Sequence, residues 1–134
     1  EVILDSGAAD HVADAASAPG YTVEPSKGSR MNVGFIAANG ERIANEGQMK
    51  LNLVGGTGAE IQSTFQACKV NRPLWSVAKI CDSGYEVLFT STAAHVRSPG
   101  STDNICSFDK IGGLYVGNLQ LRSPKSEGFS RQGK

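Results

Sequence analysis

The chain has 134 residues and a mass of 14.1 kDa, the size of one ordinary domain. Hydrophobic residues make up 40% of it and charged residues 19%, which argues against a disordered chain of low hydrophobicity. Thirteen basic and thirteen acidic residues cancel, so no net charge favours nucleic acid or anionic lipid. Apolar runs are too short for a membrane span or a signal-peptide core. We therefore expect neither a nucleic-acid partner nor a membrane partner.

The three cysteines are an odd number and have no Cys-x-x-Cys spacing. This predicts reduced thiols in an intracellular protein, with Cys68 and Cys81 buried and Cys106 partly exposed. His11 and His95 are not clustered with the cysteines in the sequence, so we expect no metal site.

Short apolar stretches separated by glycine-rich turns predict an all-β domain. The first strand is Val2–Leu4, which stops at Asp5. Residues 33–38 and 43–53 flank Asn39-Gly40, the strongest two-residue hairpin signal, because both turn positions need a positive φ. The sequence therefore predicts a hairpin at this point.

Residues 61–70 alternate in polarity and are expected to pair with residues 50–54 across a glycine-rich turn. Residues 76–83 are the one expected helix, with Val77, Ile80 and Cys81 on one face and Gly84 as its cap. We expect strands at residues 85–89 and 114–121, and turns over residues 91–104.

The most informative residues are Asp5-Ser6-Gly7-Ala8, where an apolar strand delivers a carboxylate into a turn of small residues. By itself this pattern is typical of a plain turn in which the aspartate caps its own backbone.

The order of several motifs gives the pattern more meaning. The run LDSGAADHV at residues 4–12 is followed by Ala38-Asn39-Gly40, by LWSVAKI at residues 74–80, and by GLYV at residues 113–116. In this order and spacing, residues 1–121 resemble the retropepsin-like aspartic proteases, most closely those of copia-type retrotransposon polyproteins.

The resemblance implies a retropepsin-like acid protease fold: a small closed β-barrel with a flap hairpin and one short helix, active as a homodimer. It implies a protease core at residues 1–90 and a segment at residues 91–121 that resembles the protease–integrase connector. Residues 122–134 are expected to be a basic, flexible tail.

The resemblance also implies an aspartic endopeptidase that cuts extended segments of a retroelement polyprotein, in the cytoplasm or within a retroelement particle. Asp5 and its symmetry mate would activate a water, with no cofactor and no metal. Ser6 and Gly7 would support the catalytic loop. The remaining site residues fall into three groups: a flap formed by Ile36, Ala37, Ala38, Asn39, Gly40 and Glu41; a rim formed by Ala8, Asp10 and His11; and a second loop formed by Leu74, Trp75 and Ser76.

The sequence departs from the family at several points. The Asp–Arg pair of retroviral members is replaced by Ala9 and Val77, and we expect Asp10 or His11 to substitute at the rim. Ser76 stands where many members have glycine. Family members also have a further hairpin before the active-site strand, so we expect an unpaired sheet edge at this end of the chain. These departures keep two alternatives open: a catalytically inactive retropepsin-fold fragment or dimerisation or binding module, and a small β-barrel binding domain unrelated to proteases.

Overall fold

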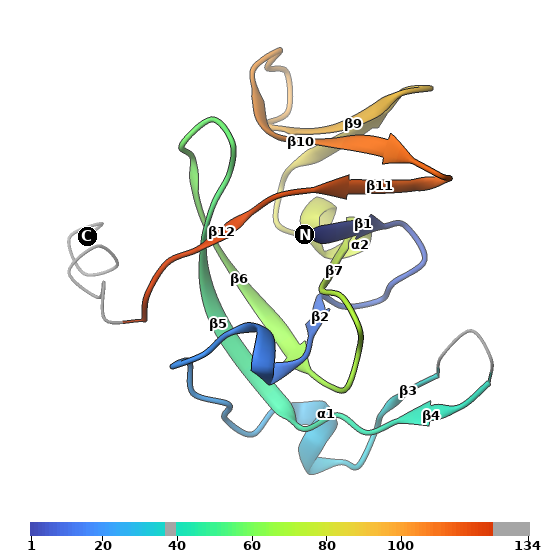
Figure 1. Cartoon of the computed structure of the whole chain (residues 1–134), viewed down its shortest axis with the longest axis vertical. Helices are drawn as coiled ribbons and strands as arrows, with labels where there is room; N and C mark the ends of the chain where they lie inside the picture. Colours follow the sequence, from blue (N-terminus) through green and yellow to red (C-terminus); the bar gives the residue numbers. More distant parts are fainter. Residues whose placement is uncertain (37–39, 125–134) are drawn as a thin grey trace.

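The computed structural model describes residues 1–36 and 40–124, and about 44% of the structure is strand and 11% helix. One sheet has ten strands, and β3 and β4 form a separate two-stranded sheet (Figure 1). The strands are β1 (Val2–Asp5), β2 (Val12–Ala13), β3 (Phe35–Ile36), β4 (Arg42–Ile43), β5 (Gly47–Val54), β6 (Glu60–Ala67), β7 (Leu74–Ser76), β8 (Glu86–Phe89), β9 (Ala93–Arg97), β10 (Asn104–Ile111), β11 (Leu114–Gly117) and β12 (Gln120–Leu121). The helices are η1 (Ala15–Ser17), α1 (Lys27–Arg30) and α2 (Val77–Asp82).

The first strand lies inside the large sheet, whose order is β12-β5-β6-β2-β7-β1-β11-β10-β9-β8. β1 pairs in parallel with β7, where Asp5 is opposite Ser76, and antiparallel with β11, where Val2 is opposite Gly117. The expectation of an unpaired edge at this end of the chain is therefore wrong. Strands from the middle and the end of the described chain supply both partners.

β1 and β2 are consecutive in the chain but are separated in the sheet by β7. β7 runs parallel to β1 and antiparallel to β2. The loop between β1 and β2, residues 6–11, therefore passes the end of β7 where α2 begins. This topology brings the aspartate turn and the second predicted loop together.

The large sheet curls but does not close into the expected barrel. Its end strands, β12 and β8, are hydrogen-bonded only to β5 and β9 in the part of the chain that the structure describes. The β5–β6 turn instead packs on β10 through side chains, and the Thr57 hydroxyl donates a 2.9 Å hydrogen bond to the Ile105 carbonyl. The prediction of a closed barrel is therefore wrong, because no backbone ladder joins the two end strands among the described residues.

Two local predictions are confirmed. β5 and β6 pair over eight residues each, as their alternating polarity predicts. α2 begins after Ser76, whose hydroxyl oxygen accepts from the Lys79 N–H, and ends before Gly84 (φ 96°). The Gly84 and Tyr85 N–H groups bond back to carbonyls of the last turn, which is the Schellman arrangement. The expectation of a single short helix is wrong, since α1 and η1 are also present.

The segment predicted as turns, residues 91–104, contains β9, which pairs with both β8 and β10. Residues 114–121 form two strands, β11 and β12, which pair with different parts of the sheet. The segment compared with a connector thus lies in the same sheet as β1. At its end, Arg122 is held by a 2.9 Å ion pair with Glu60, while residues 125–134 of the expected tail lie outside the described residues.

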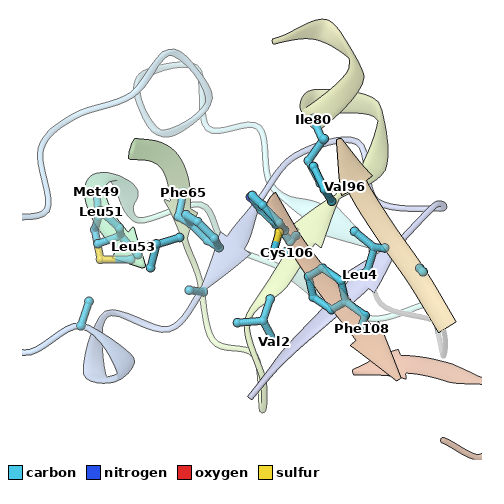
Figure 2. Close-up of a cluster of buried hydrophobic side chains, with 14 of the residues drawn as sticks. Val2, Leu4, Met49, Leu51, Leu53, Phe65, Ile80, Val96, Cys106 and Phe108 are labelled. Carbon is cyan, nitrogen blue, oxygen red and sulfur yellow. The ribbon is translucent and has the colours of Figure 1, made fainter. Parts of the chain in front are cut away.

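One hydrophobic core joins both halves of the curled sheet (Figure 2). Its most buried large side chains include Met49 and Phe65 from the β5–β6 hairpin and Phe108 from β10. Cys68 and Cys106 are buried and Cys81 is exposed, and all three thiols are free. The expectations of a buried Cys81 and a partly exposed Cys106 are therefore both wrong. The core includes Val2, Leu4, Leu51, Leu53, Trp75, Ile80, Ala94 and Val96.

Candidate active site

Asp5 ends β1 and is half-buried. Its Oδ1 accepts a 2.8 Å hydrogen bond from the Gly7 N–H, which fixes the carboxylate over its own turn. Oδ2 receives no hydrogen bond from the described residues. Ser6 and Gly7 are exposed beside it. One carboxylate oxygen is therefore held by the backbone while the other is available to a ligand.

Ser76 connects the aspartate turn to α2. It is fully buried, and its hydroxyl donates a 2.7 Å hydrogen bond to the Ala8 carbonyl while accepting from the Lys79 N–H at 3.2 Å. Its own N–H donates to His11 Nδ1 at 2.9 Å. Ser76 thus links residues 8 and 11 to the start of α2 through hydrogen bonds.

His11 was expected at the exposed rim, and this is wrong: the side chain is 7% exposed. Its ring stacks on Phe65, with ring centroids 5.1 Å apart. Burial and, to a smaller extent, the charge of Lys79 lower the pKa of His11 to about 4. At neutral pH the ring is uncharged, and Nδ1 accepts the Ser76 hydrogen bond because the proton is on Nε2.

Asp10 forms an ion pair with Lys79, with Oδ1 and Nζ 3.4 Å apart. This pair joins the aspartate loop to α2. Both side chains are more than a third exposed, so solvent screens the interaction. Asp10 and His11 therefore both bridge the two loops, one through charge and one through a buried hydrogen bond.

Leu74 and Trp75, in the second predicted loop, have different surroundings. Leu74 lines the space beside Asp5, whereas Trp75 is 2% exposed and packs in the core with its ring centroid 5.9 Å from that of Phe108. The buried Trp75 indole N–H has no hydrogen-bond partner among the described residues. Trp75 therefore supports the site from behind rather than contacting a ligand beside Asp5.

A groove of about 510 Å³ runs between the Asp5 turn and the β3–β4 hairpin. Phe35, Ile36 and Ile43 line it from the hairpin side, and Asp5 and Gly7 from the other. Its volume lies within the usual range for ligand sites. Its other lining residues are Ala8, Ala9, Asp10, Val12, Cys68, Val70 and Leu74.

The β3–β4 hairpin corresponds to the predicted flap, with shorter strands than the sequence suggests. Ile36 is 75% exposed, and Gly40 and Glu41 are exposed on the other side of the turn. Gly40 has the positive φ that the hairpin signal predicts, at 85°. The flap predictions for Ala37, Ala38 and Asn39 lie outside the described residues.

A second hollow of about 440 Å³, which sequence reasoning missed, borders Asp5 and Ser6 on the side of β11. Its apolar wall includes Phe89 and Tyr115, whose rings meet edge to face at 4.9 Å, and Leu114, which is 42% exposed. Leu114 lies in the GLYV motif and Phe89 in an expected strand, but nothing local in the sequence places either beside the aspartate. The order β1-β11-β10-β9-β8 in the sheet does so. Phe35 and Ile43 could have been found from their places on either side of Asn39-Gly40.

Comparison with known proteins gave no match among family models, curated proteins or solved structures. Within residues 1–36 and 40–124, no helix has the length and apolar character needed to cross a membrane. The same residues contain no cluster of three or more His, Cys, Asp or Glu side chains that could hold a metal ion.

Proposed function

We propose that the chain is an aspartic endopeptidase with a retropepsin-like fold that hydrolyses peptide bonds of a retroelement polyprotein. The observation that carries the proposal is the position of Asp5 on the wall of a groove whose opposite wall is a β-hairpin. An extended peptide in that groove would lie between the carboxylate and the hairpin, so that the hairpin can exclude water around the scissile bond.

The chemistry requires two carboxylates. One must take a proton from the attacking water while the other, protonated, donates a hydrogen bond to the peptide carbonyl oxygen. Asp5 is the only acidic residue whose carboxylate is available at this turn within the described chain, because Asp10 is paired with Lys79. A second copy, related by two-fold symmetry, would supply the other carboxylate, and the pair would share one proton because adjacent like charges resist joint ionisation.

The surface beside Asp5 is suited to such a second copy. The hollow at Ser6 is walled by Phe89 and Leu114, and both of these apolar side chains are about two-fifths exposed. Apolar side chains next to a half-complete site favour an association that also buries them. The homodimer is thus the assembly that completes the proposed site.

The test is a cleavage assay at pH 4 to 7 on a library of short extended peptides with an apolar central pair. Wild type, Asp5→Asn and the control Asp103→Asn, which removes an exposed carboxylate in the β9–β10 loop, are compared at matched concentrations. We expect wild type and Asp103→Asn to cut with a dependence on protein concentration steeper than first order, and Asp5→Asn to be silent.

Two outcomes would reject the enzyme. Cleavage by Asp5→Asn at the wild-type rate would show that another group is responsible. No cleavage by any variant, together with elution as a folded monomer, would leave the alternative of an inactive retropepsin-fold module, since a single Asp5 lacks its partner.

A further inference from the structure

The groove beside Asp5 continues past the β3–β4 hairpin into a second hollow of about 620 Å³. The two spaces share Ala9, Asp10 and Phe35 as lining residues, so one extended ligand could occupy both. The second hollow is lined by Lys27 and Gly28 of α1, by Gln48 of β5 and by Gln66 of β6. Figure 1 shows α1 next to the start of β5.

The floor of this extension is polar and held in place. Gln48 and Gln66 are directly opposite each other on β5 and β6. The Asn45 amide donates to Gln66 Oε1 at 2.9 Å, and the Ser26 hydroxyl lies 3.4 Å from Asn45 Oδ1. A Cβ at Gly28 would come within 2.6 Å of the Asn45 amide nitrogen, so α1 is packed closely on this network. The lining therefore includes fixed amide groups beside the apolar side chains of Met31, Val33 and Phe35.

The charged side chains that line the extension are Asp10, Lys79 and Lys27. The first two neutralise each other across 3.4 Å. Lys27, on α1, is exposed and takes part in none of the ion pairs among the described residues, and the nearby Glu24 is paired with Lys50 at 3.8 Å. Lys27 is therefore a cation at this end of the groove, near the amide side chains, that has no ion-pair partner among the described residues.

We propose that this extension is an acid-selecting subsite, in which Lys27 binds a carboxylate of the substrate peptide. The preferred substrate is then an extended peptide with apolar residues around the scissile bond and an Asp or Glu further along the chain. The inference rests on the proposed protease function. In a two-fold dimer each copy contributes one such subsite, so acidic residues are favoured on both sides of the bond that is cut.

The test separates binding from cleavage. Fluorescently labelled peptides with an apolar centre, identical except for Glu or Gln at one outer position, are titrated by anisotropy against the Asp5→Asn protein. We expect one or more positions at which the Glu peptide binds about fivefold more tightly than the Gln peptide, the effect of a partly exposed ion pair. This preference should weaken as salt is raised.

Lys27→Glu should reverse the preference between Glu and Gln peptides. Arg30→Glu is the matched control, since Arg30 is an exposed cation on the same helix that does not line the extension. Equal binding of Glu and Gln peptides at every position would overturn the subsite, and so would the same loss of preference in both variants.

Parallel cleavage assays with wild type keep the two proposals apart. If wild type fails to cut peptides that Asp5→Asn binds with a preference for Glu, the subsite stands and the protease function fails. If wild type cuts but does not distinguish Glu from Gln, the protease function stands and the subsite fails.

Discussion

The buried N–H of Ser76 donates a 2.9 Å hydrogen bond to Nδ1 of His11, across the boundary between the aspartate loop and α2. The bond exists only while the imidazole is neutral, because a protonated ring has no acceptor. The same contact therefore ties the arrangement of the candidate active site to pH.

The hydrogen bond between Ser76 and His11 predicts that the fold loses stability in acid. The pKa of His11 falls from its ordinary value of 6.5 to about 4 in the folded chain, so the unfolded state binds more protons between these values. The stabilisation is fully present above pH 6.5 and is lost as the pH falls through 4, with a total on the order of 3 kcal/mol. Urea unfolding at pH 7, 5.5 and 4.5 measures it.

The variants for this prediction are His11→Asn and His95→Asn. An asparagine in place of His11 keeps an acceptor near the position of Nδ1 but does not titrate, so we expect the slope of unfolding free energy against pH to flatten. His95 bonds to Ser107 at the surface, and its variant should keep the wild-type slope. An unchanged slope in His11→Asn would contradict the role given to this residue.

Ser76→Ala removes the hydroxyl that bonds to the Ala8 carbonyl and caps α2. We expect a loss of about 1–3 kcal/mol in unfolding free energy, because a part-buried carbonyl and a helix N–H lose their partners. Ser83→Ala at the other end of the same helix removes only an exposed bond to the Lys79 carbonyl and should cost less than about 0.5 kcal/mol. Similar losses of unfolding free energy in the two variants would contradict the proposal that Ser76 links the aspartate loop to α2.

Gly34→Ala tests the base of the β3–β4 hairpin. A Cβ at this position would collide with the backbone carbonyl of Ile43, which cannot move without shifting the paired strand. We expect faster amide exchange in the hairpin and at least a tenfold loss of peptide cleavage. Gly56→Ala, in the open β5–β6 turn where nothing lies within 4 Å of a new Cβ, is the neutral control. Full activity of Gly34→Ala would remove the hairpin from the proposed mechanism.

Leu114→Asp tests the surface for the second copy. Leu114 borders the hollow next to Asp5, and Ile111, on the same β10–β11 hairpin, is even more exposed but does not line that hollow. We expect Leu114→Asp to raise the dimer dissociation constant at least tenfold in analytical ultracentrifugation, since a buried unpaired carboxylate opposes association. Ile111→Asp should leave it close to the wild-type value. The opposite order would place the interface elsewhere.

The parts of the fold that the sequence predicts correctly are local. Alternating polar and apolar residues indicate the β5–β6 hairpin, and the spacing of Val77 and Ile80 before Gly84 indicates α2. On that helix the turn of about 100° per residue carries Cys81 out of the core once Ile80 faces inward, which apolar spacing alone does not resolve. β9 was missed because Ala93–Arg97 contains only one β-branched residue.

The candidate site was predictable in part, for a related reason. A motif identifies Asp5 and the hairpin because the residues that carry them are contiguous in sequence. The burial of His11 depends on Phe65 and Ser76, which lie far along the chain, and a polar residue in a loop gives no sign of this. The acid-selecting extension likewise needs α1 and the β5–β6 floor to meet, and neither element is marked by the family resemblance.

The interior position of β1 also bears on how the chain folds. The first strand can be placed only after Leu74 and Gly117, its neighbours on either side, have been synthesised. Such distant pairings carry a large loop-closure cost and slow folding. On a ribosome, the Asp5 turn would therefore be among the last parts to take shape, and the groove beside it would form only after almost all of the described chain had emerged.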